Sequence, residues 1–534
     1  MSMRYRLKGI LFWGILLLAA ACVKEPKMTF EEVEQRSLAV WIEKYHPELK
    51  DNYQENGGYY VDILDYGVQD SVAVTGKDVW MWYNFTNRDF DGNVCETRDW
   101  LTAYQLGTYT DHTHYNPVFR FSGKESHTLM EGTYLATFNT LKVKNKESGV
   151  IEDVEVRYGT KMRLYMPSTV TTNTAGTTSD GGYEGQYTLD ENRPIIVDME
   201  VYGHVANPVE YEGERVDLFA RINGGVCTDH KSKTQESAKL PRRTTRADEP
   251  SDEPVDTRPL EFFDGRWHQP IDTLEHLYVN YAYTPESVSF KFRNADDAHY
   301  PDEGRYNAGT IYSTTAGVSQ LDDVDSRINK ALVERFGKGI TRDEVLTADS
   351  LKVNATAKVW YVGRFLDGYI FDTNIDEVKQ IVFGKVENEG EALSFNTRKP
   401  LDNNYILAWN YALPTLRYGQ WATILTVSTY AYGLKGQVGT HTSTTTSNND
   451  AYYDTMNYYN YMNYMNSYYG YGYGGMYNNG YYGYDPYYYG YDYSANTDST
   501  TTTVTTTSTE IQSYTPLIFQ VFVEKGTDLP SSDK

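Results

Sequence analysis

A histidine pair, a glycine-rich run and three cysteines are the first residues of this chain whose types and spacing suggest chemistry. His112 and His114 would point to one face of a strand and could ligate a metal ion there, although we favour a solvated loop. The run from Gly470 to Gly475 alternates glycine with tyrosine outside any strand-to-helix context, which argues against a phosphate-binding loop. No cysteine set has the spacing of a zinc site, and no Ser/His/Asp arrangement stands out. We therefore expect no metal and no cofactor.

A series of aromatic residues in the last third of the chain suggests a different kind of site. Residues 357–372 read AKVWYVGRFLDGYIFD, which predicts two strands joined by a tight turn at Asp367-Gly368. Residues 405–433 open with YILAW, which predicts the start of a short helix, and end with a strand followed by the turn TYAYG. A last apolar strand, from Pro516 to Val523, closes this block.

With these motifs in this order, the chain resembles the FKBP-type peptidyl-prolyl isomerases. The tyrosine-bearing strand, the D-G turn, the F-D pair, the tryptophan that opens a helix and the A-Y-G turn all recur, over residues 348–433 and 511–525. The resemblance implies an α+β fold, in which a curved antiparallel β-sheet wraps on a short α-helix. It also implies an isomerase, or rotamase, that assists protein folding by acting on proline-containing polypeptides.

Prolyl isomerisation requires a pocket and no nucleophile. Amide resonance sets a barrier of about 20 kcal/mol, and the twisted C–N bond of the transition state has a less polar carbonyl than the planar amide. An apolar, water-poor pocket therefore favours the twisted form. The resemblance implies that Trp409 lies beneath the proline ring, that Tyr432 donates a hydrogen bond to a substrate carbonyl and that Asp372 lies at the rim. It implies that the walls and the rest of the pocket come from Tyr361, Phe371, Phe519, Ile406 and Ile511.

Beside this pocket the chain departs from the family pattern. Asn404-Tyr405 replaces the usual acidic-valine pair, and Leu393 stands where an aromatic wall is common. A low-complexity insertion at residues 434–510 replaces the overhanging loop, with nineteen tyrosines in residues 452–493 and two Thr-rich arms that could pair as a hairpin. These departures leave a second interpretation open. It is a non-catalytic FKBP-fold surface or scaffold lipoprotein that binds protein or glycan partners through the tyrosine-rich loop.

Residues 57–228 repeat the same order of elements, which predicts an internal repeat and a second, diverged FKBP-like domain. Tyr83 falls at the position of the family tyrosine, but Cys95-Glu96 replaces the F-D pair. A threonine or a tyrosine replaces the tryptophan, and the A-Y-G turn is absent. We therefore expect a degenerate pocket in this domain and place any activity in the C-terminal domain, at residues 348–525.

The rest of the chain divides into connecting segments. Residues 22–56 predict a tether and a helix that begins with a capping box. Residues 229–258 predict a charged linker, and residues 259–347 predict connecting strands and a helix from Ser319 to Phe336. We expect that helix to precede the C-terminal domain as the first helix precedes the N-terminal domain.

The first residues predict a route to the bacterial cell envelope. Residues 1–21 combine basic residues, an apolar run too short to span a bilayer and small residues before Cys22, which resembles a lipoprotein signal peptide; a plain secretory signal is the alternative. Lipidated Cys22 would anchor the chain, and Val23 in place of an aspartate favours the outer membrane, on either face, where an outer-membrane protein could be a partner. Cys95 and Cys227 could pair in an oxidising periplasm or remain two small hydrophobic residues. The formal net charge of −24 argues against a nucleic-acid partner.

Overall fold

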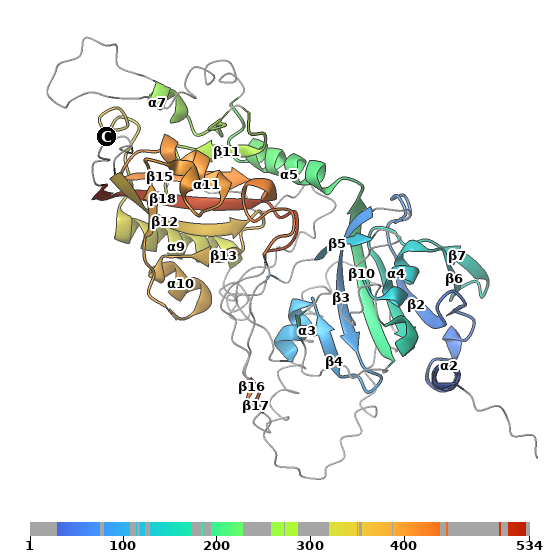
Figure 1. The fold of residues 1–534 in the computed structure, drawn as a ribbon. Helices are drawn as coiled ribbons and strands as arrows, with labels where there is room; N and C mark the ends of the chain where they lie inside the picture. Colours follow the sequence, from blue (N-terminus) through green and yellow to red (C-terminus); the bar gives the residue numbers. More distant parts are fainter. Residues whose placement is uncertain are drawn as a thin grey trace, which may run out of the picture.

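The structure, a computed structural model, contains two large antiparallel sheets with helices packed against them (Figure 1). The fold class is therefore α+β, as the sequence predicts. The structure describes residues 29–74, 79–106, 114, 118–122, 129–171, 183–184, 194–227, 258–271, 273–286, 320–349, 351, 355–386, 388–437, 445–446, 501–502 and 511–529. The expected signal peptide, Cys22, nearly all of the linker and the tyrosine-rich part of the insertion lie outside these residues. Among the helices of the described residues, none is both long and apolar enough to cross a membrane.

The first large sheet belongs to the part of the chain that we call the first unit. Its strands lie in the order β1, β2, β8, β10, β3, β4 and β9, and β5 pairs with β3. Their bounds are Tyr53–Gln54 (β1), Tyr59–Tyr66 (β2), Val79–Arg88 (β3), Val94–Thr97 (β4), Val118–Ser122 (β5), Thr160–Met166 (β8), Tyr183–Glu184 (β9) and Ile195–Val205 (β10). One face of this sheet is covered by α4 (Glu131–Phe138), because Ala136 of the helix shares a buried apolar cluster with Leu164 and Val197 of the sheet.

The second large sheet belongs to what we call the second unit. Its strands lie in the order β11, β15, β18, β12 and β13, and β14 pairs with β12. Their bounds are Leu277–Asn280 (β11), Ala355–Phe365 (β12), Ile370–Thr373 (β13), Leu393–Asn396 (β14), Gln420–Thr426 (β15) and Leu517–Asp528 (β18). The first sheet has the same order in β2, β8, β10, β3 and β4, with β5 on β3. The two sheets therefore share one topology.

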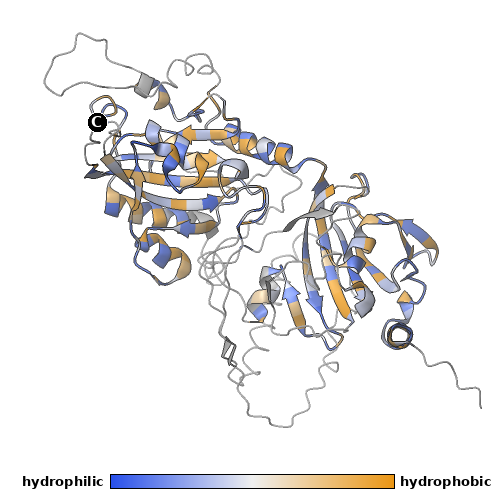
Figure 2. Cartoon of the chain, in the orientation of Figure 1, coloured by the Kyte–Doolittle hydropathy of each residue, from blue (hydrophilic) through white to orange (hydrophobic). Residues whose placement is uncertain are grey.

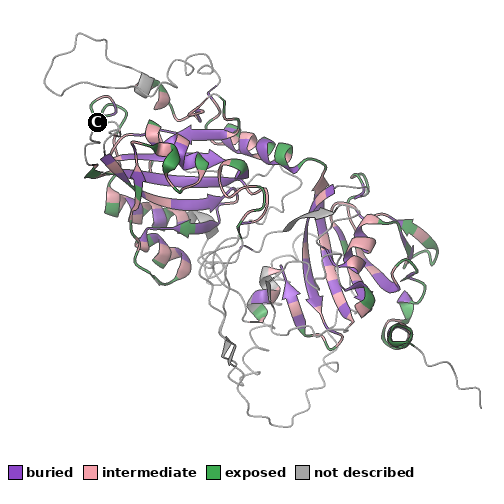
Figure 3. Ribbon diagram, viewed as in Figure 1, coloured by how far each residue is buried: buried purple, intermediate pink, exposed green. Residues whose placement is uncertain are grey.

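Both faces of the second sheet are buried, which explains why β18 is apolar on both faces from Leu517 to Val523, except at Gln520. Phe519 and Val521 belong to the cluster around α11 (Leu407–Ala412), whereas Ile518 and Phe522 belong to the cluster on the opposite face. The helices of that opposite face are α5 (Pro208–Ile222), α9 (Gln320–Phe336) and α10 (Asp376–Phe383). Hydrophobic residues follow the strands of both sheets in Figure 2, and Figure 3 shows these strands largely buried.

Shorter elements connect these parts. They are the 3-10 turns η1 (Pro47–Leu49), η2 (Ser168–Val170), η3 (Pro400–Asp402), η4 (Leu413–Thr415) and η5 (Ser428–Tyr430), the helices α3 (Trp100–Gln105) and α7 (Arg258–Phe262), and the hairpin of β6 (Leu141–Lys144) and β7 (Ile151–Val154). The Thr-rich arms of the insertion pair as β16 (Thr445–Thr446) and β17 (Thr501–Thr502), which confirms the expected pairing.

The helices confirm one prediction and correct another. The first helix, α2 (Phe30–Tyr45), begins with the expected capping box between Thr29 and Glu32. The helix expected from Ser319 is present as α9, but its predicted place is wrong, because α9 follows β11 and packs on the second sheet. The helix α5, which precedes α7 and β11 and also packs on the second sheet, was missed by the sequence analysis. The apolar spacing of α9 predicts a buried face but does not say what covers it.

Candidate functional site

Trp409 lies at the centre of an aromatic cluster in the second unit. The residue is on α11, and 4% of its surface is exposed. Its ring centroid is 5.3 Å from that of Phe519 and 5.0 Å from that of Tyr361, with interplanar angles of 84° and 72°. These edge-to-face contacts are favourable for aromatic pairs, and they fix the three rings relative to one another.

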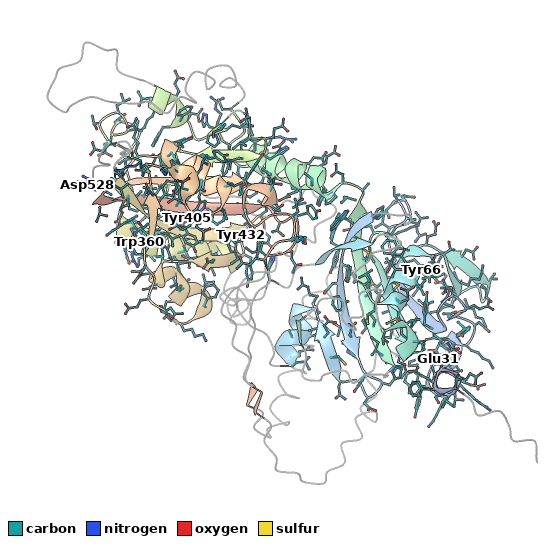
Figure 4. All side chains as sticks on the ribbon, in the orientation of Figure 1. Glu31, Tyr66, Trp360, Tyr405, Tyr432 and Asp528 are labelled. Atoms are coloured by element: carbon teal, nitrogen blue, oxygen red, sulfur yellow. The ribbon has the colours of Figure 1, made fainter. Side chains whose placement is uncertain are left out.

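Phe371 and Tyr432 extend this cluster. The ring of Phe371, on β13, is 5.8 Å from Phe519 and 6.3 Å from Tyr432, both nearly perpendicular. Ile511 is buried in the same cluster, and Ile406 packs against it. The structure thus brings together all the apolar residues that the sequence predicts for the pocket. Tyr405 and Tyr432 both lie in the second unit, in the same part of the view (Figure 4).

The pairing of β12 with β18 places these side chains on one face of the sheet. Tyr361 lies opposite Val521, and Gly363 lies opposite Phe519. Alternate residues of a strand share a face, so Tyr361 and Gly363 both lie on the side of α11. A Cβ at position 363 would come within 2.6 Å of the Phe371 ring. Glycine at this position therefore leaves the space that the Phe371 ring occupies.

Asp372 and Tyr361 form the polar edge of the cluster. The Tyr361 hydroxyl donates a hydrogen bond to Asp372 Oδ2. Asp372 is exposed as a whole, yet loss of solvent around its carboxyl raises its pKa above the ordinary value, against the lowering effects of Tyr361, the Thr373 backbone N–H and Lys379. Burial and the Asp372 charge raise the pKa of Tyr361 well above its ordinary value. The Tyr361 hydroxyl therefore remains a hydrogen-bond donor at neutral pH.

Tyr432 carries a hydroxyl that makes no hydrogen bond within the described residues. Burial, and next the Asp372 charge, raises the pKa of Tyr432 to about 12. The turn around Tyr432 is fixed by its backbone, because the Ser428 carbonyl accepts hydrogen bonds from the N–H groups of Ala431 (2.9 Å) and Gly433 (2.7 Å). Gly433 has a φ of 75°, a conformation that favours glycine. The turn thus presents a protonated hydroxyl beside the aromatic cluster.

The indole Nε1 of Trp409 is buried and has no hydrogen-bond partner among the described residues. Most buried polar groups in folded proteins are paired. An unpaired buried donor costs about 1–3 kcal/mol, so the fold tolerates a cost in order to keep a tryptophan at this position.

Sequence reasoning missed several aromatic members of the cluster. Tyr405, noted there only as a departure, lies 5.9 Å from Trp409 and stacks on Phe395 at 6.4 Å. Phe395 is fully buried two residues after Leu393, which only packs against the cluster. Phe365 lies 5.2 Å from Phe371. The period-two spacing of Tyr361 and Phe365 could have revealed the latter.

On the face of its sheet that α4 covers, the first unit has no cluster around a tryptophan among its described residues. Its aromatic rings gather on the other face, where Trp41 of α2 lies 4.8 Å from Phe90 and 5.6 Å from Tyr165. Tyr83 is buried, 5.6 Å from Phe85, and Met130 and Met166 lie in the same apolar core. The position expected for the tryptophan lies in α4, where Thr133 is buried. The core between this sheet and α4 is therefore built from methionine and aliphatic side chains, with only a few aromatic residues.

The structure describes Cys95 and Cys227, and it places Cys227 beside an acidic residue and a histidine. Cys95 and Cys227 are both unpaired in this structure. Donor atoms of Cys227, Asp264 and His268 lie within 4.8 Å of one another, but the Asp264 carboxylate already bonds His268 Nε2 at 2.8 Å and Arg266 Nε at 2.6 Å. These contacts account for the cluster without an ion.

His114 lies at a contact between the units and is buried, so the solvated loop that we favoured is wrong for this residue. His112 lies outside the described residues, so a metal site made by the two histidines is not tested. His114 Nε2 is 2.7 Å from Asp367 Oδ2, at the D-G turn between β12 and β13. The imidazole also stacks on Phe365, with ring centroids 4.4 Å apart. This histidine therefore contacts the second unit beside the aromatic cluster.

Comparisons with known proteins return FKBP-type isomerases among solved structures. The chain is similar to AtFKBP13, with 15% identity over 29% of this chain and 98% of that one at a TM-score of 0.19. It is similar to the three FKBP domains of wheat FKBP73, with 11% identity over 88% of this chain and 95% of that one at a TM-score of 0.17. It is also similar to FkpA from Escherichia coli, with 15% identity over 38% of this chain and 83% of that one at a TM-score of 0.17. At TM-scores this low these likenesses carry no assignment by themselves. No protein-family model and no curated protein matches the chain.

Proposed function

We propose that this chain is a peptidyl-prolyl cis-trans isomerase, or foldase, of the bacterial cell envelope, with its activity in the second unit. Its fold would be two FKBP-like domains, of which the first is degenerate. Its clients would be proline-containing polypeptides. A lipid on Cys22 would hold it at the outer membrane, facing the periplasm or the outside.

The observation that carries this proposal is the convergence of Trp409, Phe371 and Tyr432 on one cluster. These residues come from α11, β13 and the turn after β15, far apart in the sequence. Each alone would be an ordinary core residue. Their ring contacts through Phe519, together with the polar edge at Asp372, match the arrangement that the sequence resemblance implies.

The cluster can favour the isomerisation transition state without forming a covalent bond. A proline ring seated against Trp409 would lose its water, and the twisted, less polar amide loses less by this transfer than the planar amide. The Tyr432 hydroxyl, which is protonated at neutral pH, would donate to a carbonyl of the peptide and hold the bond in place. Asp372 would act through Tyr361, because it accepts a hydrogen bond from the Tyr361 hydroxyl and so fixes the wall of the pocket that this tyrosine forms.

A non-catalytic scaffold is the second candidate, and one observation favours it. The first unit has the same strand order, but the face that α4 covers has no tryptophan among its described residues, so this chain contains the topology once without the candidate site. In that case the tyrosine-rich loop, not the aromatic cluster, would bind protein or glycan partners.

A protease-free assay separates the isomerase from the scaffold. It measures the rate of cis–trans exchange in a proline peptide with the chain from residue 23 onward added. We expect faster cis–trans exchange, and a Tyr432→Phe variant about three- to ten-fold slower, since one hydrogen bond is worth about 0.5–1.5 kcal/mol. Tyr430→Phe, on the same turn, is the matched control and should keep the full rate. An uncatalysed rate with folded wild-type protein would reject the isomerase and favour the scaffold.

A further inference from the structure

Each unit has a turn that a glutamate from a preceding helix holds by two hydrogen bonds. In the first unit, Glu34 of α2 accepts from the backbone N–H of Ser168 at 2.9 Å and from its Oγ at 2.7 Å. In the second unit, Glu212 of α5 accepts from the backbone N–H of Ser428 and from its Oγ at 2.8 Å. Ser168 begins η2 after β8, and Ser428 begins η5 after β15, so the two contacts occupy the same place in the shared topology.

Burial makes this contact strong. Glu212 is 1% exposed and Ser428 2% exposed, whereas Glu34 is 8% exposed. A carboxyl group removed from water must be hydrogen-bonded, and both oxygens of each glutamate are bonded to the serine. The repetition in two units whose sequences differ indicates that the contact belongs to the architecture and is not an accident of one helix.

In the second unit the contact reaches the candidate site. The backbone of Ser428 is bonded at both ends, because its N–H donates to Glu212 while its carbonyl accepts from Ala431 and Gly433. Those two residues flank Tyr432. The position of the Tyr432 hydroxyl therefore depends on where Glu212 holds Ser428. The first unit has no A-Y-G turn after its serine, so the same contact there holds no such tyrosine.

We propose that Glu212 is a positioning residue for isomerisation, which holds Tyr432 against the aromatic cluster through Ser428. This inference rests on the proposed function, because it assigns Tyr432 a role in that reaction. It adds that the site is incomplete without α5, the helix that follows β10 of the first unit directly.

Two measurements on the full chain test the proposal. They are the isomerisation rate and the rate of hydrogen exchange of the backbone amides from Ser428 to Gly433. We expect Glu212→Ala to speed exchange in this turn and to lower kcat/KM about three- to ten-fold. Glu212→Gln should restore both, because its amide carbonyl accepts from the Ser428 N–H and its NH2 donates to Ser428 Oγ. Glu34→Ala is the matched control. It should speed exchange at Ser168 to Val170 and leave the isomerisation rate unchanged.

A double variant distinguishes positioning from general stability. If Glu212 acts through Tyr432, the loss in Glu212→Ala combined with Tyr432→Phe should be no larger than in the single variants. Multiplied losses, or unchanged exchange at Ser428 in Glu212→Ala, would overturn the proposal. Ser428→Ala, which removes one of the two bonds, serves if Glu212→Ala does not fold. An inactive wild-type protein would reject the proposed function, while the exchange data would still decide whether Glu212 holds the turn.

Discussion

At the scale of single residues, the space around one glycine decides whether the aromatic cluster can form. Gly363 lies on β12 with the Phe371 ring packed where a Cβ would be. Phe371 in turn contacts Phe519 and Tyr432, so a shift of this ring would move the whole wall.

We expect Gly363→Ala to lower the free energy of unfolding by about 1–3 kcal/mol, the usual cost of overpacking a core, and to lower isomerisation. Urea unfolding and the peptide assay measure the two effects. Adding Phe371→Leu to this variant should recover part of the stability, since the smaller side chain makes room for the methyl group, but should not recover the activity. Full stability of Gly363→Ala alone would contradict the packing described for Phe371.

At the scale of elements, a buried charge ties α9 to the strand that carries Tyr361. Arg364 of β12 is 1% exposed and forms an ion pair at 2.7 Å with Asp325 of α9. Its side chain also donates to Gln520 of β18 at 2.9 Å and to the Gly368 carbonyl of the D-G turn at 3.1 Å. The arginine therefore holds one helix, two strands and a turn together from the face opposite the aromatic cluster.

Asp325→Leu should destabilise the second unit by about 3–5 kcal/mol, because it leaves the Arg364 charge buried without its partner. Equilibrium unfolding in urea measures this. The control is Lys330→Ala on the same helix, which removes an exposed pair with Glu334 and should change stability by no more than about 0.5 kcal/mol. Equal effects of the two substitutions would show that the buried Arg364–Asp325 pair stabilises the unit no more than the exposed Lys330–Glu334 pair.

A second element, α5, should make the stability of the fold depend on pH, because it carries the ionisable Glu212. Burial raises the pKa of this carboxyl from 4.5 to about 7, against the lowering effects of the Ser428 donors and of His276. The folded chain then binds the proton more tightly than the unfolded chain. The contribution of this group to stability is therefore full below about pH 4.5 and is lost as the pH rises through about 7.

We expect the melting temperature of the wild type to fall more between pH 5 and 8 than that of Glu212→Gln, whose side chain does not titrate. Thermal unfolding followed by circular dichroism across this range measures the difference. His276 and Tyr514 also face Glu212, and His276 bonds Asp217; both residues are the same in the two proteins, so the comparison isolates Glu212. The same slope in both proteins would show that the Glu212 proton does not contribute.

At the scale of the whole molecule, the two units meet at contacts that the sequence gives no sign of. His114 packs on Phe365 and bonds Asp367, and Trp82 of β3 stacks on Tyr211 of α5 with ring centroids 5.2 Å apart. Both contacts lie on elements that lead to the candidate site. The first unit therefore supports the second even though it lacks the candidate site itself.

His114→Ala should speed hydrogen exchange of the Gly368 and Tyr369 amides, because it removes both the ring that covers this turn and the partner of Asp367. Exchange followed by mass spectrometry measures this. His46→Ala, which removes an exposed histidine–glutamate pair within the first unit, is the control and should leave that turn unchanged. Unaltered exchange in His114→Ala would mean that the units do not hold each other at this turn.

Local signals in the sequence were enough to predict much of the second unit. The Asp367-Gly368 turn fixes the hairpin of β12 and β13, the spacing of Val324, Ile328 and Leu332 predicts α9, and the separated aromatic motifs meet in one cluster. Asn207 and Pro208 also mark the start of α5, as an N-cap followed by proline, although this signal was missed.

Contacts between distant segments could not be predicted in the same way. Glu212 and Ser428 are 216 residues apart, and nothing in either local sequence indicates the other. The same holds for His114 and Asp367, which are 253 residues apart. A boundary placed at residue 348 from local motifs omits both β11 and the glutamate that holds the Tyr432 turn. Such pairings depend on the topology, which periodicity does not encode.

The most direct test of the account is whether a proline ring sits against Trp409. Intermolecular nuclear Overhauser effects between a proline-containing peptide and the full chain would measure this. The account predicts contacts from the proline ring protons to the Trp409 indole and the Phe371 ring. In the control, a peptide with alanine in place of proline should give no contacts from the alanine side chain to these two rings. Contacts to another surface, or none to these rings while the peptide is turned over, would contradict it.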